Sequence, residues 1–222
     1  ENSEGEYSSV GGRMFVGQPE EMVVQEAVFT RRATDRILRY AFELARTRRR
    51  KVSLATKSNG LKISMPWWDE RFAAIAAEYP DVAADKYHID ILAANFVTHP
   101  DWYDVVVGSN LFGDILSDLG PAVAGSIGIA ASGNINPDRT GPSMFEPVHG
   151  SAPDIAGRGI ANPVGQIMAG AMMLDHLGLA QAARTIERAV ETVLVEYGPR
   201  TRDLGGTATT CEAGDAILAA LG

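Results

Sequence analysis

The residues best suited to chemistry are two aspartates, Asp114 and Asp118, which lie four positions apart. In an α-helix this spacing places both carboxylates on one face. Two carboxylates repel each other unless a positive charge lies between them, and oxygen ligands suit a hard divalent cation such as Mg²⁺ or Mn²⁺. The alternative is a solvated helix face carrying two exposed aspartates. Spacing alone favours this second interpretation.

The segments around the two aspartates shift the balance toward a binding site. Residues 104–108 form an apolar run rich in β-branched residues that ends at a glycine, which predicts a buried strand. Asn110 is a good helix cap and predicts the start of the helix that carries the aspartates, with Ile115 and Leu116 turned toward the core. A strand that leads directly into such a helix places the carboxylates at the carboxyl end of a sheet, where α/β folds bind their ligands.

Strands and helices alternate along the chain, which predicts the α/β class. Predicted strands lie at residues 22–29, 51–56, 82–87 and 104–108, after a loop-and-hairpin region over residues 1–20. Predicted helices start at the capping residues Thr30, Ser64, Asn110 and Asn162. Three more cover residues 88–97, residues 179–197 and the end of the chain to about Leu221. Between residues 120 and 142 the composition shifts to Gly, Ala, Ser, Asn and Pro, which predicts a crossover between domains.

Composition narrows the range of partners. The 222 residues suffice for one large or two small domains, and the net charge of −8 argues against nucleic acid and anionic membranes as partners. No apolar run reaches the roughly 20 residues that a membrane span needs. Cys211 is the only cysteine, so an intrachain disulfide cannot form, and a reducing compartment, the cytoplasm, is predicted.

Three further residues could carry chemistry, and each has an ordinary alternative. Lys57 follows a predicted strand and could act as a base beside a metal, or it could be a surface lysine. Asp90 could be a third metal carboxylate or an exposed helix residue. Tyr7 could donate a proton or simply pack as an aromatic side chain.

The loop after residues 145–148 contains His149, Gly150 and Ser151, whose donors and small side chains suit a phosphate group. The signal is weak, because no Gly-x-Gly-x-x-Gly or Walker pattern accompanies it, and His149 could equally fill the loop. Neither a zinc-ligand spacing nor a Gly-x-Ser-x-Gly elbow occurs. Zinc hydrolases and serine hydrolases are therefore poor interpretations.

Three segments, at residues 108–118, 145–157 and 159–163, together resemble the β-decarboxylating dehydrogenases. That family includes isopropylmalate, isocitrate, homoisocitrate and tartrate/D-malate dehydrogenases, and residues 1–9, 55–60 and 88–92 look most like the tartrate/D-malate branch. The resemblance implies the isopropylmalate/isocitrate dehydrogenase-like fold. The nucleotide site of this fold is not a Rossmann site, so the missing glycine-rich pattern is expected.

The resemblance also implies a role for each candidate residue. Asp114 and Asp118 are expected to bind Mg²⁺ or Mn²⁺ together with Asp90 of the partner subunit. Lys57 is expected to take the substrate hydroxyl proton, and Tyr7 to protonate the enolate left after CO₂ departs. Residues expected to contact the dinucleotide are Asn59 beside the nicotinamide, and His149, Gly150, Ser151, Ala152, Asp154, Ile155 and Asn162 around the adenosine.

The implied activity is the metal-dependent oxidation and decarboxylation of a small 2-hydroxy dicarboxylic acid by NAD⁺, of the tartrate or D-malate type. The implied enzyme is a homodimer with composite active sites, with K⁺ as an optional further cation. One alternative is 3-isopropylmalate dehydrogenase, and another is a non-catalytic dimerising fragment that lacks the substrate-binding arginines. Residues 1–124 are expected to form the small domain with the dimer interface, catalytic and metal residues. Residues 125–222 are expected to form the C-terminal part of the large nucleotide-binding domain, the rest of which would precede residue 1.

Overall fold

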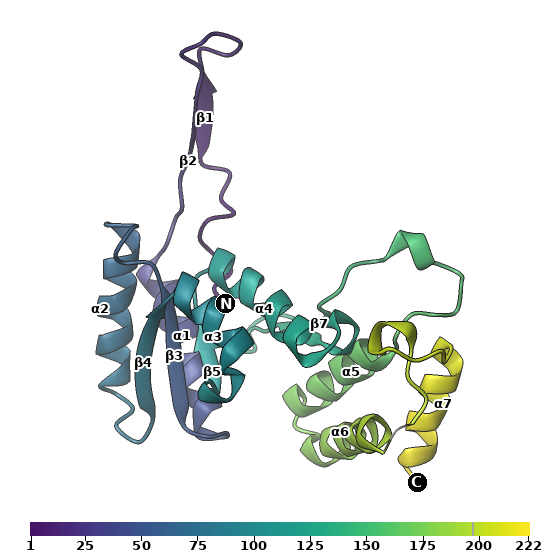
Figure 1. The fold of residues 1–222 in the computed structure, drawn as a ribbon. Coiled ribbons are helices and arrows are strands. Elements are labelled where there is room, and N and C mark those ends of the chain that lie inside the picture. Colours follow the sequence, from purple (N-terminus) through teal and green to yellow (C-terminus); the bar gives the residue numbers. More distant parts are fainter. Residues whose placement is uncertain (197) are drawn as a thin grey trace. The chain divides into compact units, whose positions relative to one another are not determined.

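The computed structural model describes residues 1–196 and 198–222, which form two compact units (Figure 1). Unit 1 comprises Glu1–Leu119 and unit 2 comprises Gly120–Gly222. The division falls inside helix α4 (Asn110–Ala124), whose last residue is the end of the predicted first domain. The predicted end of the helix over residues 179–197 lies at Tyr197, outside the described residues.

Unit 1 is built on a parallel sheet with strand order β4-β3-β5. The strands are β3 (Lys51–Thr56), β4 (Ala83–His88) and β5 (Val105–Val107), so the predicted strands are confirmed to within a residue or two. The central strand β3 is buried from Val52 to Thr56. Parallel strands joined by helices confirm the predicted α/β class.

Helices α1 (Arg31–Arg46), α2 (Ser64–Ala76) and α3 (Ile89–Thr98) complete unit 1, with the short turn η1 (Pro100–Trp102). Thr30 caps α1 as predicted, because its side chain accepts the Ala33 N–H. The spacing of Trp68, Phe72, Ile75 and Tyr79 after Ser64 predicts an apolar helix face, and all four side chains are buried in the core. Ser64 itself is not a cap, since α2 begins at this residue and no side chain caps it.

Two details predicted for α4 are wrong. Asn110 is the first helical residue and its Nδ2 donates to the Ser3 carbonyl, so its side chain does not cap the helix. Leu116 is buried as predicted, but Ile115 is 48% exposed. Neighbouring helical positions differ by about 100° in direction, so Ile115 can face solvent while Leu116 faces the core.

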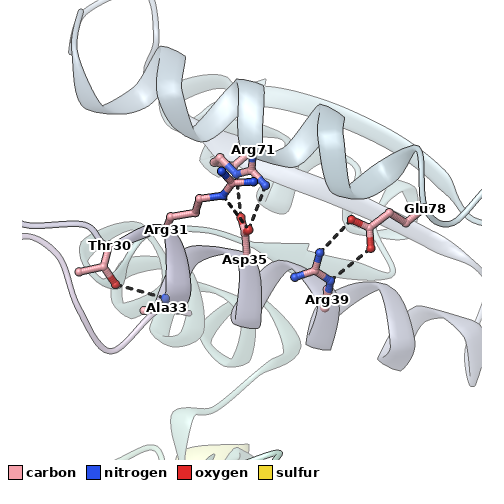
Figure 2. Close-up of polar contacts among 7 residues, drawn as sticks. All are labelled: Thr30, Arg31, Ala33, Asp35, Arg39, Arg71 and Glu78. Atoms are coloured by element: carbon pink, nitrogen blue, oxygen red, sulfur yellow. Dashed lines mark hydrogen bonds and ion pairs between the residues drawn. The ribbon is translucent and has the colours of Figure 1, made fainter.

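Helices α1 and α2 are joined by ion pairs of contrasting burial, which Figure 2 shows side by side. Asp35 accepts two hydrogen bonds from Arg71, at 2.7 and 2.9 Å, and Arg31 approaches it at 3.4 Å. The Asp35 and Arg71 side chains are only 13% and 15% exposed. Burial alone would raise the pKa of Asp35, but the two arginines outweigh it and lower the pKa.

We expect Asp35→Asn to lower the free energy of unfolding by about 3 kcal/mol at pH 7, because it leaves the Arg71 charge buried without its partner. A lowered folded-state pKa stabilises the protein above the unfolded-state value, about 3.9, and this contribution is lost as the pH falls through the folded value. The difference between wild type and variant should therefore shrink below about pH 4. Urea unfolding at several pH values measures both effects.

The control for this variant is Glu78→Gln. Glu78, two residues past the end of α2, pairs with Arg39 of α1 at 2.8 Å, but both side chains are nearly half exposed. An exposed pair contributes about 1 kcal/mol or less. Equal destabilisation by the two variants would contradict the importance assigned to the Asp35 pair.

A two-stranded hairpin extends from unit 1 (Figure 1). Strands β1 (Gly11–Met14) and β2 (Met22–Gln25) pair antiparallel, and among the described residues neither pairs with a further strand. The strand predicted for residues 22–29 thus ends at Gln25. Gly11 has φ +152°, and a Cβ atom there would lie 2.0 Å from the Val24 carbonyl oxygen. Only glycine therefore fits at this position of the hairpin.

Unit 2 contains a small antiparallel pair and three helices. The strands are β6 (Ala131–Asn134) and β7 (Met144–Pro147), and the helices are α5 (Val164–His176), α6 (Ala180–Val195) and α7 (Thr210–Ala220). Short turns of 3₁₀-helix lie at η2 (Ile127–Ile129), η3 (Pro153–Ile155) and η4 (Arg202–Leu204). Its core is formed by Val164, Ala189, Val190, Val193 and Ile217. In the part of the chain that the structure describes, no helix combines the length and apolarity that crossing a membrane requires.

Candidate active site

Asp114 and Asp118 both lie exposed on α4, as their spacing predicts. The start of this helix is held by Glu6, which sequence reasoning did not single out. One Glu6 carboxylate oxygen accepts the Ser109 hydroxyl at 2.6 Å and the other accepts the Leu111 N–H at 3.1 Å. A negative charge at a helix N-terminus is stabilising. Because Glu6 is distant in sequence from α4, no local spacing could have identified this contact.

Tyr7 lies beside the first of the two aspartates. Its hydroxyl donates a hydrogen bond to Asp114 Oδ2 at 2.5 Å, although the side chain is 59% exposed. The hydrogen bond to Asp114 is the largest cause that raises the pKa of Tyr7, since it favours the protonated phenol. Tyr7 is therefore a protonated phenol whose hydroxyl is hydrogen-bonded to a carboxylate.

Lys57 and Asp90 form a second pair, at the carboxyl ends of two adjacent strands. Lys57 follows β3 directly, and Asp90 lies in the first turn of α3 after β4. The Lys57 Nζ donates to Asp90 Oδ1 at 2.7 Å. The hydrogen bond from Lys57 is the main cause that lowers the pKa of Asp90, so this carboxylate is charged at neutral pH. Asn59 is exposed in the turn after Lys57, where Gly60 N–H donates to the Lys57 carbonyl.

The two pairs both belong to unit 1, but no contact joins them in the described structure. Lys57 is bonded to Asp90 and Tyr7 to Asp114. Among the described residues, no three His, Cys, Asp or Glu side chains gather where they could hold a metal ion. The predicted metal set of Asp90, Asp114 and Asp118 is thus not assembled within a single described chain. The resemblance assigns Asp90 to the partner subunit, and that assignment stays a prediction.

The loop predicted to hold the adenosine lies in unit 2 between β7 and α5. His149 Nδ1 lies 2.9 Å from the Gly150 carbonyl oxygen, and Ala152 adopts a left-handed conformation at φ 43°. Ala152 precedes η3, which contains Asp154 and Ile155. Gly150, Ser151, Ala152 and Asp154 are exposed, so the polar groups of this loop face solvent.

Asn162 differs from the loop because it is buried and both its amide nitrogen and its amide oxygen make hydrogen bonds. Its Oδ1 accepts the Val164 N–H at 3.0 Å, and its Nδ2 donates to Asp203 at 2.9 Å. The N-cap of α5 is Pro163, so the predicted cap at Asn162 lies one residue too early. Asp203 also accepts the hydroxyls of Ser126 and Thr201. Burial alone would raise the pKa of Asp203, but these three donors outweigh it and lower the pKa. The predicted contact of Asn162 with adenine stays a prediction.

Comparison with known protein families identifies the family of this chain. A model of the isocitrate/isopropylmalate dehydrogenase family matches residues 1–217. The chain belongs to this family. The resemblance drawn from residues 108–118, 145–157 and 159–163 is thereby confirmed, together with the isopropylmalate/isocitrate dehydrogenase-like fold.

Curated relatives within the isocitrate/isopropylmalate dehydrogenase family are closely similar in sequence. A D-malate dehydrogenase [decarboxylating] of Escherichia coli is 62% identical over 98% of this chain and 62% of its own length. A tartrate dehydrogenase/decarboxylase of Pseudomonas putida is 58% identical over 98% of this chain and 61% of its own length. The chain therefore spans about three fifths of the length of these relatives.

Solved structures of the same family share the fold. An isocitrate dehydrogenase from Methylococcus capsulatus matches with a TM-score of 0.90 and 43% identity, over 100% of this chain and 65% of that one. A β-decarboxylating dehydrogenase from Thermococcus kodakarensis matches with a TM-score of 0.83 and 40% identity, over 99% and 62% of the two chains.

Proposed function

We propose that the whole protein containing this chain oxidises and decarboxylates a small 2-hydroxy dicarboxylic acid of the tartrate or D-malate type, with NAD⁺ as the hydride acceptor. The proposal depends mainly on the two residue pairs at the ends of the unit 1 elements, Lys57 with Asp90 and Tyr7 with Asp114. They supply a base, a proton donor and carboxylates in one unit. The D-malate and tartrate dehydrogenases among the relatives support this substrate class over 3-isopropylmalate.

The donor types fit a hard divalent cation. Asp114 and Asp118 present exposed carboxylates from one helix, and Mg²⁺ or Mn²⁺ prefers oxygen ligands. Two side chains leave most of an octahedral set open, which Asp90 of the partner subunit, the substrate and water would complete. When bound, such a cation polarises the hydroxyl of the substrate and offsets negative charge that develops on its oxygen.

The protein side chains would move two protons. Lys57 takes the proton of the substrate hydroxyl, directly or through a water molecule, as hydride leaves the same carbon for the nicotinamide. The resulting 2-keto acid carries a β-carboxylate, which departs as CO₂ and leaves an enolate. Tyr7, whose phenol is protonated at neutral pH, then gives its proton to the carbon of that enolate.

We also propose that the enzyme is a homodimer in which the hairpin contacts a second copy of the chain. The hairpin exposes Met14, Phe15, Val16, Met22, Val23 and Val24. A two-stranded hairpin alone is marginally stable in water, and contiguous exposed apolar surface marks an interaction site. A second copy would also bring the Lys57 and Asp90 pair of one subunit to Asp114 of the other.

Cofactor and substrate preference test the proposal. We expect NAD⁺ to give a kcat/KM at least about 10-fold above that of NADP⁺, a difference of about 1.4 kcal/mol. The exposed Asp154 carboxylate would accept hydrogen bonds from the adenosine ribose and repel a 2′-phosphate. Steady-state rates with both cofactors, and with D-malate, tartrate and 3-isopropylmalate, measure the preference.

Two variants refine this test. Asp154→Asn should lower the ratio of kcat/KM with NAD⁺ to kcat/KM with NADP⁺. Asp138→Asn removes the same charge from another exposed loop of unit 2 and should leave this ratio unchanged. Comparable kcat/KM values for NAD⁺ and NADP⁺ in the wild type would refute the cofactor assignment. If the enzyme turns over 3-isopropylmalate but neither D-malate nor tartrate, the proposed substrate class is wrong.

A further inference from the structure

Asp69 on α2 connects the two strand ends that carry Lys57 and Asp90. Its Oδ1 accepts the Thr56 hydroxyl at 2.7 Å, and its Oδ2 accepts the Lys86 ammonium at 2.6 Å. Thr56 is the last residue of β3, immediately before Lys57, and Lys86 lies on the adjacent strand β4. One carboxylate therefore ties together a helix and the carboxyl ends of two paired strands.

Hydrogen-bond donors surround the Asp69 carboxylate, which is largely buried. Its side chain is only 13% exposed. Burial alone would raise its pKa, but the hydrogen bonds from Lys86, Thr56 and Ser58 outweigh it and lower the pKa. The group is therefore an ionised carboxylate, which accepts hydrogen bonds only and matches donors on every side. Because Thr56 immediately precedes Lys57, its hydrogen bond to Asp69 constrains the chain at the point where Lys57 begins.

Anchoring α2 does not by itself require a carboxylate. Met65, Trp68, Phe72 and Ile75 already bury one face of the helix in the core. Keeping a charge largely away from water costs free energy, and a well-packed apolar side chain is often as stabilising as such an ion pair. A role in holding Lys57 accounts for the charge at this position.

We propose that Asp69 is a positioning residue, which holds the segment at Thr56 so that the Lys57 side-chain nitrogen lies near Asp90 and, as the neutral amine, can take the proton of the reacting hydroxyl. The inference rests on the proposed role of Lys57 as the base. Misplacement of a reacting group by about 1 Å lowers turnover by about 100-fold. Asp69 acts through Lys57 and touches no reacting atom itself.

The kinetic test uses Asp69→Asn in the intact enzyme, with Glu70→Gln as the matched control. Glu70 is exposed, and the described structure gives it no hydrogen bond or ion pair. We expect Asp69→Asn to lower kcat by about 10- to 100-fold with a much smaller change in the KM of the dicarboxylate. Thr56→Val, which keeps the shape and removes one donor, should lower kcat in the same direction. Glu70→Gln should match the wild type.

A double variant separates positioning from general stability. Lys57→Ala keeps a residual rate, because the other catalytic groups remain. If Asp69 acts through Lys57, adding Asp69→Asn to Lys57→Ala should cause no further loss. If Asp69→Asn instead lowers kcat by the same factor in both backgrounds, or matches Glu70→Gln, the inference is wrong.

Chemical labelling gives a readout that does not depend on turnover. Acetylation of Lys57 by acetic anhydride, followed by peptide mass spectrometry, should be several-fold faster in Asp69→Asn than in the wild type, with exposed Lys62 as internal reference. An unchanged Lys57 labelling rate would overturn the inference. If the wild type oxidises no 2-hydroxy acid, the proposed function fails, and labelling still decides whether Asp69 positions Lys57.

Discussion

An equimolar mixture of Lys57→Ala and Asp114→Asn subunits, each with at most a small residual rate alone, is expected to recover about one quarter of wild-type activity after unfolding and refolding. The proposed composite site takes Lys57 and Asp90 from one subunit and Asp114, Asp118 and Tyr7 from the other. In a mixed dimer one site then contains both changes and the other contains none. Random exchange makes about half the dimers mixed, so about one quarter of all sites are intact.

The matched control is a mixture of Lys57→Ala and Asp90→Asn. These two residues are bonded to each other in one chain, so both changes fall on the same side of the proposed site. Every site in every dimer then contains one defect, and no activity should return. Activity measurements on refolded mixtures, with native mass spectrometry to show mixed dimers, test both cases. If mixed dimers form but the first mixture stays inactive, the site lies within one chain.

The sequence predicted the elements of unit 1 well because their patterns were strong. The β-branched run before Gly108 and the apolar stripe of α2 are recognisable without any tertiary information. Strand β6 was missed because it lies in the segment over residues 120–142, which is rich in Gly, Ser, Asn and Pro, residues that signal loops. Strand β7 was missed because it has only four residues and ends at a proline. Their pairing depends on contacts with α5, and local propensity does not report such contacts.

The candidate site shows the same division between local and distant signals. The shared face of Asp114 and Asp118 follows from helical spacing, and the place of Lys57 at a strand end follows from the strand prediction. The contacts of Tyr7 with Asp114, of Glu6 with the start of α4 and of Asp69 with Thr56 join residues far apart in sequence or on different elements. Spacing cannot reveal such contacts, because they arise only when the elements pack.

Asp114→Asn is expected to weaken Mn²⁺ binding by about 100-fold or more and to abolish turnover while leaving the fold intact. Changes in the groups that merely support metal ligands already weaken binding 10- to 100-fold, and loss of a direct carboxylate ligand should cost at least as much. Asp114 is exposed, so the change in unfolding free energy should stay within about 0.5 kcal/mol. The asparagine can still accept the Tyr7 hydroxyl through its amide oxygen, so the local contact can persist.

Asp101→Asn is the control for the metal experiment, because it removes the same charge from an exposed position of unit 1. Titration of free Mn²⁺ by electron paramagnetic resonance, with thermal unfolding and turnover measured on the same samples, compares the two variants. Only Asp114→Asn should lose metal affinity. Both variants remove one negative charge, but only Asp114 is a proposed ligand, and the effect of a distant charge is screened beyond about 8 Å at physiological ionic strength. If Asp114→Asn binds Mn²⁺ as the wild type does, α4 presents an exposed acidic face and the metal assignment is wrong.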